Sequence, residues 1–254
     1  MAARTGAHLV WRPVLLGAIY RATSAPQGAA GSASDVFNPT KKRITSSAFK
    51  RTIARYGIEH NEPPKHPVKT TGALRLLYSV DGDQRVKLSK ALFRAYWVEG
   101  KDVSDGDVLI DVVRRSGVSG VEGIVKSIED GSFEGQKERR ELESATDLAV
   151  RRGSPGVPAF WVPREVWTDK QGKQKQGRLY WGQDRLQFVE AVLLAMNEGR
   201  DGSSPGSISR PLRSLVPRCV KGNGIPNGEE VKLEFWYDFS SPCTITVRTQ
   251  VDMC

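Results

Sequence analysis

The spacing of apolar side chains predicts a long central run of helices. Apolar residues recur every three or four positions, which is the period of one helix face. Gly57 follows the first of these segments and is typical of a helix end, and Ser104 or Asp105 is placed to cap a later one. The predicted helices are Thr45–Tyr56, Thr71–Val80, Leu88–Val98, Asp105–Ser116, Gly120–Asp130 and Glu134–Val150.

The apolar period changes on both sides of this helical run. His8–Val14 is expected to form a short strand, and Ala159–Trp167 and Arg178–Trp181 flank a polar turn that predicts a β-hairpin. Arg185–Met196 has the pattern of an amphipathic helix, and Val231–Phe239 is a strong strand signal. Helices inserted between a first strand and a late hairpin predict an α/β domain with a helical insertion.

Composition divides the chain into a domain over residues 1–196, a flexible linker over 197–230 and a strand-bearing segment over 231–254. The linker is rich in Gly, Ser, Pro and basic residues and poor in apolar ones. Residues 1–34 are basic and carry no acidic residue, which is also the composition of a mitochondrial transit peptide. Leu9–Tyr20 is apolar enough to belong to a core, so we expect residues 8–20 to be folded.

The formal net charge is +9, but the basic residues lie in short runs near acidic ones and no nucleic-acid motif accompanies them. No apolar run reaches the length of a membrane-spanning helix. The cysteines are odd in number and form no CxxC pair or metal-ligand spacing, which favours a reducing compartment, with cytoplasm and mitochondrion left open. The histidines are too scattered to suggest a zinc site. These residues are Cys219, Cys243, Cys254, His8, His60 and His66.

Short motifs at the ends of the predicted strands are candidates for chemistry. Val157-Pro158 precedes a strand and is a candidate cis peptide bond, although an ordinary turn explains it equally well. Gln183 and Asp184 stand between a strand and a helix, where they would cap the helix or bind a ligand beside its exposed amides. Ser241 ends the last predicted strand, where a hydroxyl at a helix N-terminus can donate to a thiolate or simply serve as an N-cap.

The order of these motifs resembles the 2-hydroxychromene-2-carboxylate isomerases and kappa-class glutathione transferases, which have a DsbA-like thioredoxin fold. The resemblance covers residues 3–196. Trp11–Ile19 resembles the family's second strand and the residues directly after it, and Leu92–Gly100 resembles its insertion helix. Thr146–Phe160 is similar to the segment that leads to the family's cis-proline, and Trp181–Arg185 to its contact with the γ-glutamyl end of glutathione.

The resemblance implies glutathione as the cofactor and an electrophilic small molecule, expected to be aromatic, as the substrate. It implies that Ser241 is the catalytic residue that holds the glutathione thiolate. It also implies that Val157, beside Pro158, pairs with the cysteinyl backbone as an added strand would, and that Gln183 and Asp184 bind the γ-glutamyl end. The thiolate would open and reclose a ring in an isomerase, or form a conjugate in a transferase.

The chain departs from the family pattern in where its first strand lies. Val231–Thr244 resembles the family's first strand and active-site turn, displaced to the C-terminus, and most of the helix that should come after this turn is absent. This arrangement leads us to expect either a circular permutant or a truncated piece of a tandem repeat. In the first case Val231–Phe239 should insert into the sheet of its own chain.

Two further interpretations stay open. Cys243 could serve thiol–disulfide exchange, which the missing second cysteine disfavours. The chain could also be a truncated module that binds glutathione without catalysis. The expected partner is an electrophilic small molecule, with no nucleic acid and no membrane, and the sequence leaves open whether the chain forms a homodimer.

Overall fold

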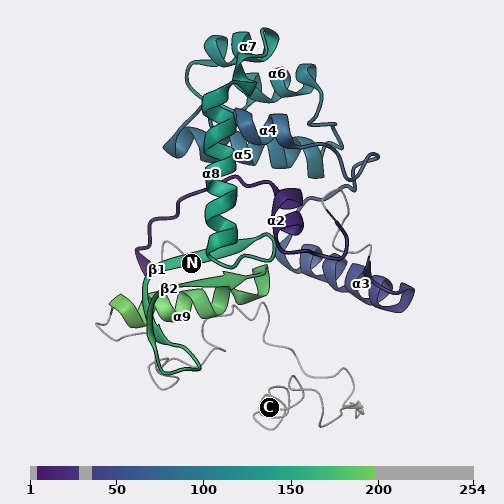
Figure 1. Cartoon of the computed structure of the whole chain (residues 1–254). Coiled ribbons are helices and arrows are strands. Elements are labelled where there is room, and N and C mark those ends of the chain that lie inside the picture. Colours follow the sequence, from purple (N-terminus) through teal and green to yellow (C-terminus); the bar gives the residue numbers. More distant parts are fainter. Residues whose placement is uncertain (1–4, 29–35, 198–254) are drawn as a thin grey trace. The chain divides into compact units, whose positions relative to one another are not determined.

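The computed structural model describes residues 5–28 and 36–197 (Figure 1). The chain divides into two units, Met1–Pro217 and Arg218–Cys254, and every described residue belongs to the first. The described elements, in order, are α2 (Leu16–Ala22), α3 (Pro39–Tyr56), α4 (Thr71–Leu76), α5 (Gly82–Trp97), α6 (Gly106–Arg115), α7 (Val121–Glu129), η2 (Ser132–Glu134), α8 (Gln136–Arg151), β1 (Ala159–Thr168), β2 (Gln174–Trp181), η3 (Gln183–Arg185) and α9 (Leu186–Asn197).

The predicted hairpin is confirmed. β1 and β2 pair antiparallel, with Ala159 opposite Trp181 and Thr168 opposite Gln174. The Asp169 carboxylate closes the polar turn, because it accepts hydrogen bonds from the backbone N–H groups of Gln171 (3.0 Å) and Lys173 (2.9 Å). An Asp side chain that binds the backbone two residues on stabilises a turn without any tertiary contact.

The hairpin contains a bulge between Val162 and Val166. Gly177 lies at this irregular part of β2 with φ of +81°, a conformation that favours glycine. A Cβ atom built at Gly177 would lie 2.1 Å from Cζ2 of Trp161. Glycine is therefore required here both for its backbone conformation and for the close approach of the indole.

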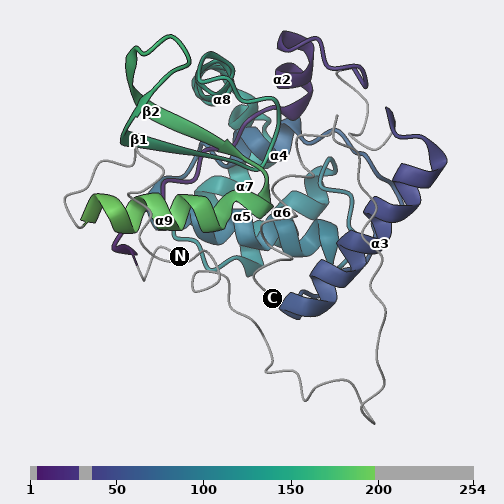
Figure 2. The same cartoon turned by 90° about the horizontal axis from the view of Figure 1, so that it is seen from below.

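The final helix, α9, packs on the hairpin, as Figures 1 and 2 both show. Val162 of β1 is buried against Val189 and Val192 of α9, and Phe160 and Tyr180 border this cluster. The alternation of β1 sends every second side chain towards α9. The amphipathic pattern predicted for Arg185–Met196 thus meets the apolar face of the hairpin.

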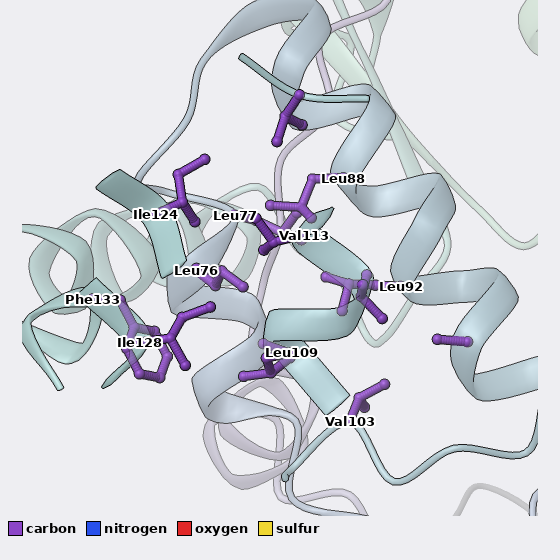
Figure 3. Close-up of a cluster of buried hydrophobic side chains, with 14 of the residues drawn as sticks. Leu76, Leu77, Leu88, Leu92, Val103, Leu109, Val113, Ile124, Ile128 and Phe133 are labelled. Carbon is purple, nitrogen blue, oxygen red and sulfur yellow. The ribbon is translucent and has the colours of Figure 1, made fainter. Parts of the chain in front are cut away.

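Helices α4, α5, α6 and α7 share one apolar core (Figure 3). Asp105 begins α6 as its N-cap, since its Oδ1 accepts a hydrogen bond of 2.8 Å from the Asp107 N–H. This decides between the two predicted caps, Ser104 and Asp105. The core includes Leu76, Leu77, Leu88, Leu92, Val103, Leu109, Val113, Ile124, Ile128 and Phe133.

Several of the predicted element boundaries were wrong. α4 ends at Leu76, earlier than the predicted Val80, and Tyr78 beyond it donates a hydrogen bond of 2.7 Å to the Pro13 carbonyl. α3 begins at Pro39, well before Thr45, because the Asn38 side chain caps it by accepting from the Lys41 N–H. α5 begins at Gly82, earlier than the predicted Leu88, and β2 begins at Gln174, earlier than the predicted Arg178.

The strand predicted at His8–Val14 is not a strand in the structure. Leu9 and Val10 are exposed, so the prediction that Val10 belongs to the core is wrong as well. A strand requires a neighbouring ladder that takes up its backbone groups, and in the part of the chain that the structure describes, the sheet consists of β1 and β2. The predicted partner, Val231–Phe239, lies outside the described residues.

Residues 8–20 are nevertheless folded. Ile19 of α2 is fully buried and Tyr20 is nearly so. The Leu15 N–H donates a hydrogen bond of 3.1 Å to the Thr146 hydroxyl of α8. The N-terminal segment is therefore attached to the rest of the fold by both packing and hydrogen bonding.

Candidate functional site

The candidate site begins at the C-terminus of α8, where the chain leaves the helix in a Schellman motif. Gly153 has φ of +81°, and its N–H donates a hydrogen bond of 2.8 Å to the Val150 carbonyl. The Ser154 N–H donates one of 3.0 Å to the Ala149 carbonyl. This pair of bonds is the defining pattern of the motif. It fixes the direction in which the chain continues towards Val157.

The turn after α8 is held at two carbonyl groups. The Ser154 hydroxyl donates a hydrogen bond of 2.7 Å to the Gly156 carbonyl. The Gly182 N–H, at the end of β2, donates one of 2.9 Å to the Pro158 carbonyl. Val157 lies between these two anchored residues.

Val157 itself is 44% exposed. Within the described parts of the chain, its N–H and C=O take part in no hydrogen bond. The Val157–Pro158 peptide bond is cis, as predicted, and so is His66–Pro67, which was not predicted. Because the N–H and C=O of Val157 are free, an extended peptide could pair with them as it would with a sheet edge.

Aromatic and aliphatic side chains border the turn. The Cβ position of Gly156 lies 3.3 Å from Nε1 of Trp181, 3.6 Å from Cε1 of Tyr20 and 3.8 Å from Cδ1 of Leu16. Trp181 is 53% exposed although it is the last residue of a strand. The turn thus sits beside an accessible indole and against α2.

Gln183 and Asp184 do not cap the last helix, which corrects the prediction. They lie within the 3₁₀ turn η3, which runs directly into α9, and the N-cap of η3 is Gly182, with φ of +100°. The Asp184 carboxylate is 57% exposed and pairs only with its neighbour Arg185, at 3.2 Å, among the residues that the structure describes. Gly182 links Asp184 to the turn, because its N–H binds the Pro158 carbonyl.

Positive charge lies close to the same turn. The Arg152 guanidinium stacks over the Trp161 ring, with its Cζ 4.5 Å from the ring centroid. Burial, and secondarily the positive charge of Arg12, lower the pKa of Arg152. Among the described residues, neither Arg152 nor Arg12 forms an ion pair. The end of α8 therefore has two guanidinium groups beside the partial negative charge of its last carbonyls.

The hairpin carries a buried acidic group that the sequence did not reveal. Glu165 is fully buried, and both of its carboxylate oxygens lie 2.9 Å from the Tyr180 hydroxyl. Arg178 approaches it at 3.4 Å. Burial raises the pKa of Glu165, and burial together with the Glu165 carboxylate raises the pKa of Tyr180. No residue pattern distinguished Glu165 from the other charged residues of the strand.

Comparison with known proteins now identifies the class. The family model of the DSBA-like thioredoxin domain matches residues 1–194, so the chain belongs to the DSBA-like thioredoxin family. The fold predicted from the sequence is thereby confirmed. No curated protein matches the sequence.

A solved structure supports the same fold. The chain is similar to a selenomethionine form of 2-hydroxychromene-2-carboxylate isomerase, with a TM-score of 0.58 and 16% sequence identity. The match covers 78% of this chain and 85% of the isomerase. At this identity the similarity concerns the fold.

The structure brings together most of the predicted site residues. Val157, Pro158, Gln183 and Asp184 lie around the hydrogen bond between Gly182 and Pro158. Ser241, the predicted catalytic residue, lies outside the described residues, as do the three cysteines. Within the described ranges, no group of three His, Cys, Asp or Glu side chains could hold a metal ion, and none of the helices there is long and apolar enough to cross a membrane.

Proposed function

We propose that this protein binds glutathione and uses its thiol in the isomerisation or transfer of an electrophilic aromatic small molecule. The observation that carries the proposal is the free backbone of Val157, held between two anchored carbonyl groups. A tripeptide in extended form can satisfy both the N–H and the C=O of Val157. Membership of a thioredoxin-like family and the isomerase-like fold support the same function.

The exposed residues after β2 fit the amino-acid end of glutathione. The Asp184 carboxylate can pair with the γ-glutamyl ammonium group, and the Gln183 side chain can donate to its carboxylate. Both side chains are exposed. The hydrogen bond from the Gly182 N–H to the Pro158 carbonyl joins these residues to the turn at Val157. The contacts with the γ-glutamyl end and with the cysteinyl backbone would therefore be held at a fixed spacing.

Bound glutathione supplies a thiol that reacts as a nucleophile once it is deprotonated. In this proposal the Ser241 hydroxyl donates a hydrogen bond to the sulfur and so favours the thiolate. Val157 orients the cysteinyl residue through its backbone. Gln183 and Asp184 fix the other end, which limits the directions in which the sulfur can point.

A pair of aspartate variants tests the binding step. Asp184→Ala should weaken glutathione binding by about tenfold or more, the loss typical of one charged hydrogen-bonded contact, and should leave the melting temperature nearly unchanged. Asp169→Ala, at the other end of the hairpin, should lower the melting temperature and leave binding unchanged, since Asp169 closes the turn. Isothermal titration calorimetry and thermal unfolding of the full chain measure both quantities.

The reverse result would make Asp184 a structural residue and would remove the γ-glutamyl contact. If wild-type protein binds no glutathione, the proposed function fails. If it binds glutathione but turns over no aromatic electrophile, the protein is a binding module without catalysis.

A further inference from the structure

Ser154 is buried to 1% exposure, yet its side chain is polar and lies three residues before the exposed Val157. Its hydroxyl makes a hydrogen bond of 2.7 Å to the Gly156 carbonyl. We propose that Ser154 is a positioning residue that sets the orientation of the Val157 peptide groups for ligand binding. This inference rests on the proposed function, because it concerns the same site.

The backbone of Ser154 is fixed independently of its side chain. Its N–H donates to the Ala149 carbonyl as part of the Schellman motif at the end of α8. The hydroxyl therefore starts from a rigid helix end. The hydrogen bond to Gly156 transmits that rigidity across Pro155 to the residue that precedes Val157.

Of the two peptide planes that flank Val157, the one on its N-terminal side is held by a hydrogen bond, and the plane that begins at the Pro158 carbonyl is held by another. The plane between Gly156 and Val157 contains the Gly156 carbonyl, which Ser154 holds, and the Val157 N–H. The carbonyl of the next residue, Pro158, is held by the Gly182 N–H. Because a peptide group is planar, fixing the Gly156 carbonyl also fixes the direction of the Val157 N–H that would bind the ligand.

Removal of the Ser154 hydroxyl should free this plane without unfolding the helix end. Ser154→Ala keeps both backbone bonds of the Schellman motif, but it leaves the buried Gly156 carbonyl without its donor. The Val157 N–H would then sample more than one direction. A ligand would have to select the competent one, which reduces its apparent affinity.

The matched control is Ser127 in α7. Its hydroxyl donates a hydrogen bond of the same length, 2.7 Å, to the Ile124 carbonyl. Ser127 lies within α7, in the part of the fold built around the core of α4 to α7. Ser127→Ala removes an equivalent bond and leaves the turn at Val157 intact. The conservative variant Ser154→Thr keeps the hydroxyl and should restore the wild-type behaviour.

The first measurement uses the full chain without ligand. Backbone ¹⁵N relaxation dispersion should show exchange at Gly156 and Val157 in Ser154→Ala, and none at these residues in wild type, Ser127→Ala or Ser154→Thr. Equal relaxation at Val157 in all four proteins would overturn the inference. This result does not depend on whether glutathione binds.

The second measurement is titration with glutathione. Ser154→Ala should raise the dissociation constant about tenfold, whereas Ser127→Ala should leave it unchanged at a comparable loss of melting temperature. If both variants bind as wild type does, Ser154 has only a structural role. Absence of binding by wild type would refute the proposed function, while the relaxation measurement would still decide the role of Ser154.

Discussion

At the scale of single residues, the buried Glu165 shows how the surroundings of a side chain set its chemistry. A glutamate is rarely fully buried, and this one is held by the Tyr180 hydroxyl and approached by Arg178. Burial is the largest cause of its raised pKa, ahead of the hydrogen bond and the positive charge, which act in the opposite direction. The folded protein therefore holds a proton on Glu165 more tightly than the unfolded chain does.

The raised pKa predicts a pH dependence of stability. The contribution of protonated Glu165 is fully present below the pKa of glutamate in an unfolded chain, about 4.3. It is lost as the pH rises through the higher pKa of the folded state. Glu165→Gln cannot lose a proton, so the free energy of unfolding of this variant, relative to wild type, should increase as the pH rises above about 4.3. Urea unfolding at several pH values measures the difference.

The control for this prediction is the exposed Glu122 at the start of α7. Glu122→Gln should give a curve nearly parallel to that of wild type over the same pH range. A parallel curve for Glu165→Gln would mean that burial does not disturb the ionisation of Glu165.

At the scale of elements, two helices with similar caps have different surroundings. Asp105 caps α6 and Asn38 caps α3, each by accepting from a backbone N–H in the first turn. α6 buries Leu109, Val112 and Val113, whereas α3 has no buried residue. A cap contributes to global stability only when its helix unfolds together with the core.

Replacement of each cap by alanine should therefore have different effects. Asp105→Ala should lower the global free energy of unfolding by about 0.5–2 kcal/mol, the usual value of an N-cap. Asn38→Ala should leave global unfolding nearly unchanged and should speed amide hydrogen exchange within α3. Denaturant unfolding measures the global loss of stability, and amide hydrogen exchange measures the local opening of α3. Equal losses of global stability would show that α3 unfolds with the core.

At the scale of the whole molecule, the sequence predicts that Val231–Phe239 supplies the strand that a thioredoxin fold requires beside β1. One face of the segment is apolar, and Trp236 makes part of the other face apolar too, as a strand covered on both faces requires. The linker, at roughly 3.3 Å per residue, is long enough to permit its return. The segment lies outside the described residues, so this remains a prediction of the sequence.

Amide hydrogen exchange of the full chain tests this prediction. Backbone amides of Val231–Phe239 should exchange slowly because a strand within a sheet donates them to its neighbours. The predicted linker begins at Asn197, but α9 includes that residue, so the amides over 198–230 should exchange at the rate of an unstructured chain. Rapid exchange over Val231–Phe239 as well would refute the circular permutant.

The local pattern of the sequence predicted most of the elements. Each predicted helix of the central run corresponds to a helix of the structure, and the hairpin and the turn at Val157 lie where the pattern placed them. These features depend on residues near one another in the chain. The spacing of apolar positions and the backbone preferences of Gly, Pro and Asp were therefore sufficient.

Tertiary structure alone decided which of these elements are buried and which residues serve the site. The apolar spacing predicted the helix Thr45–Tyr56, yet α3 packs none of its residues into a core. It placed Asp184 at a helix cap, but Asp184 lies within η3, whose N-cap is Gly182. It could not single out Ser154 or Glu165, since their roles come from partners in space. Periodicity reports the conformation of a segment, whereas burial and hydrogen bonding depend on what the rest of the chain brings to it.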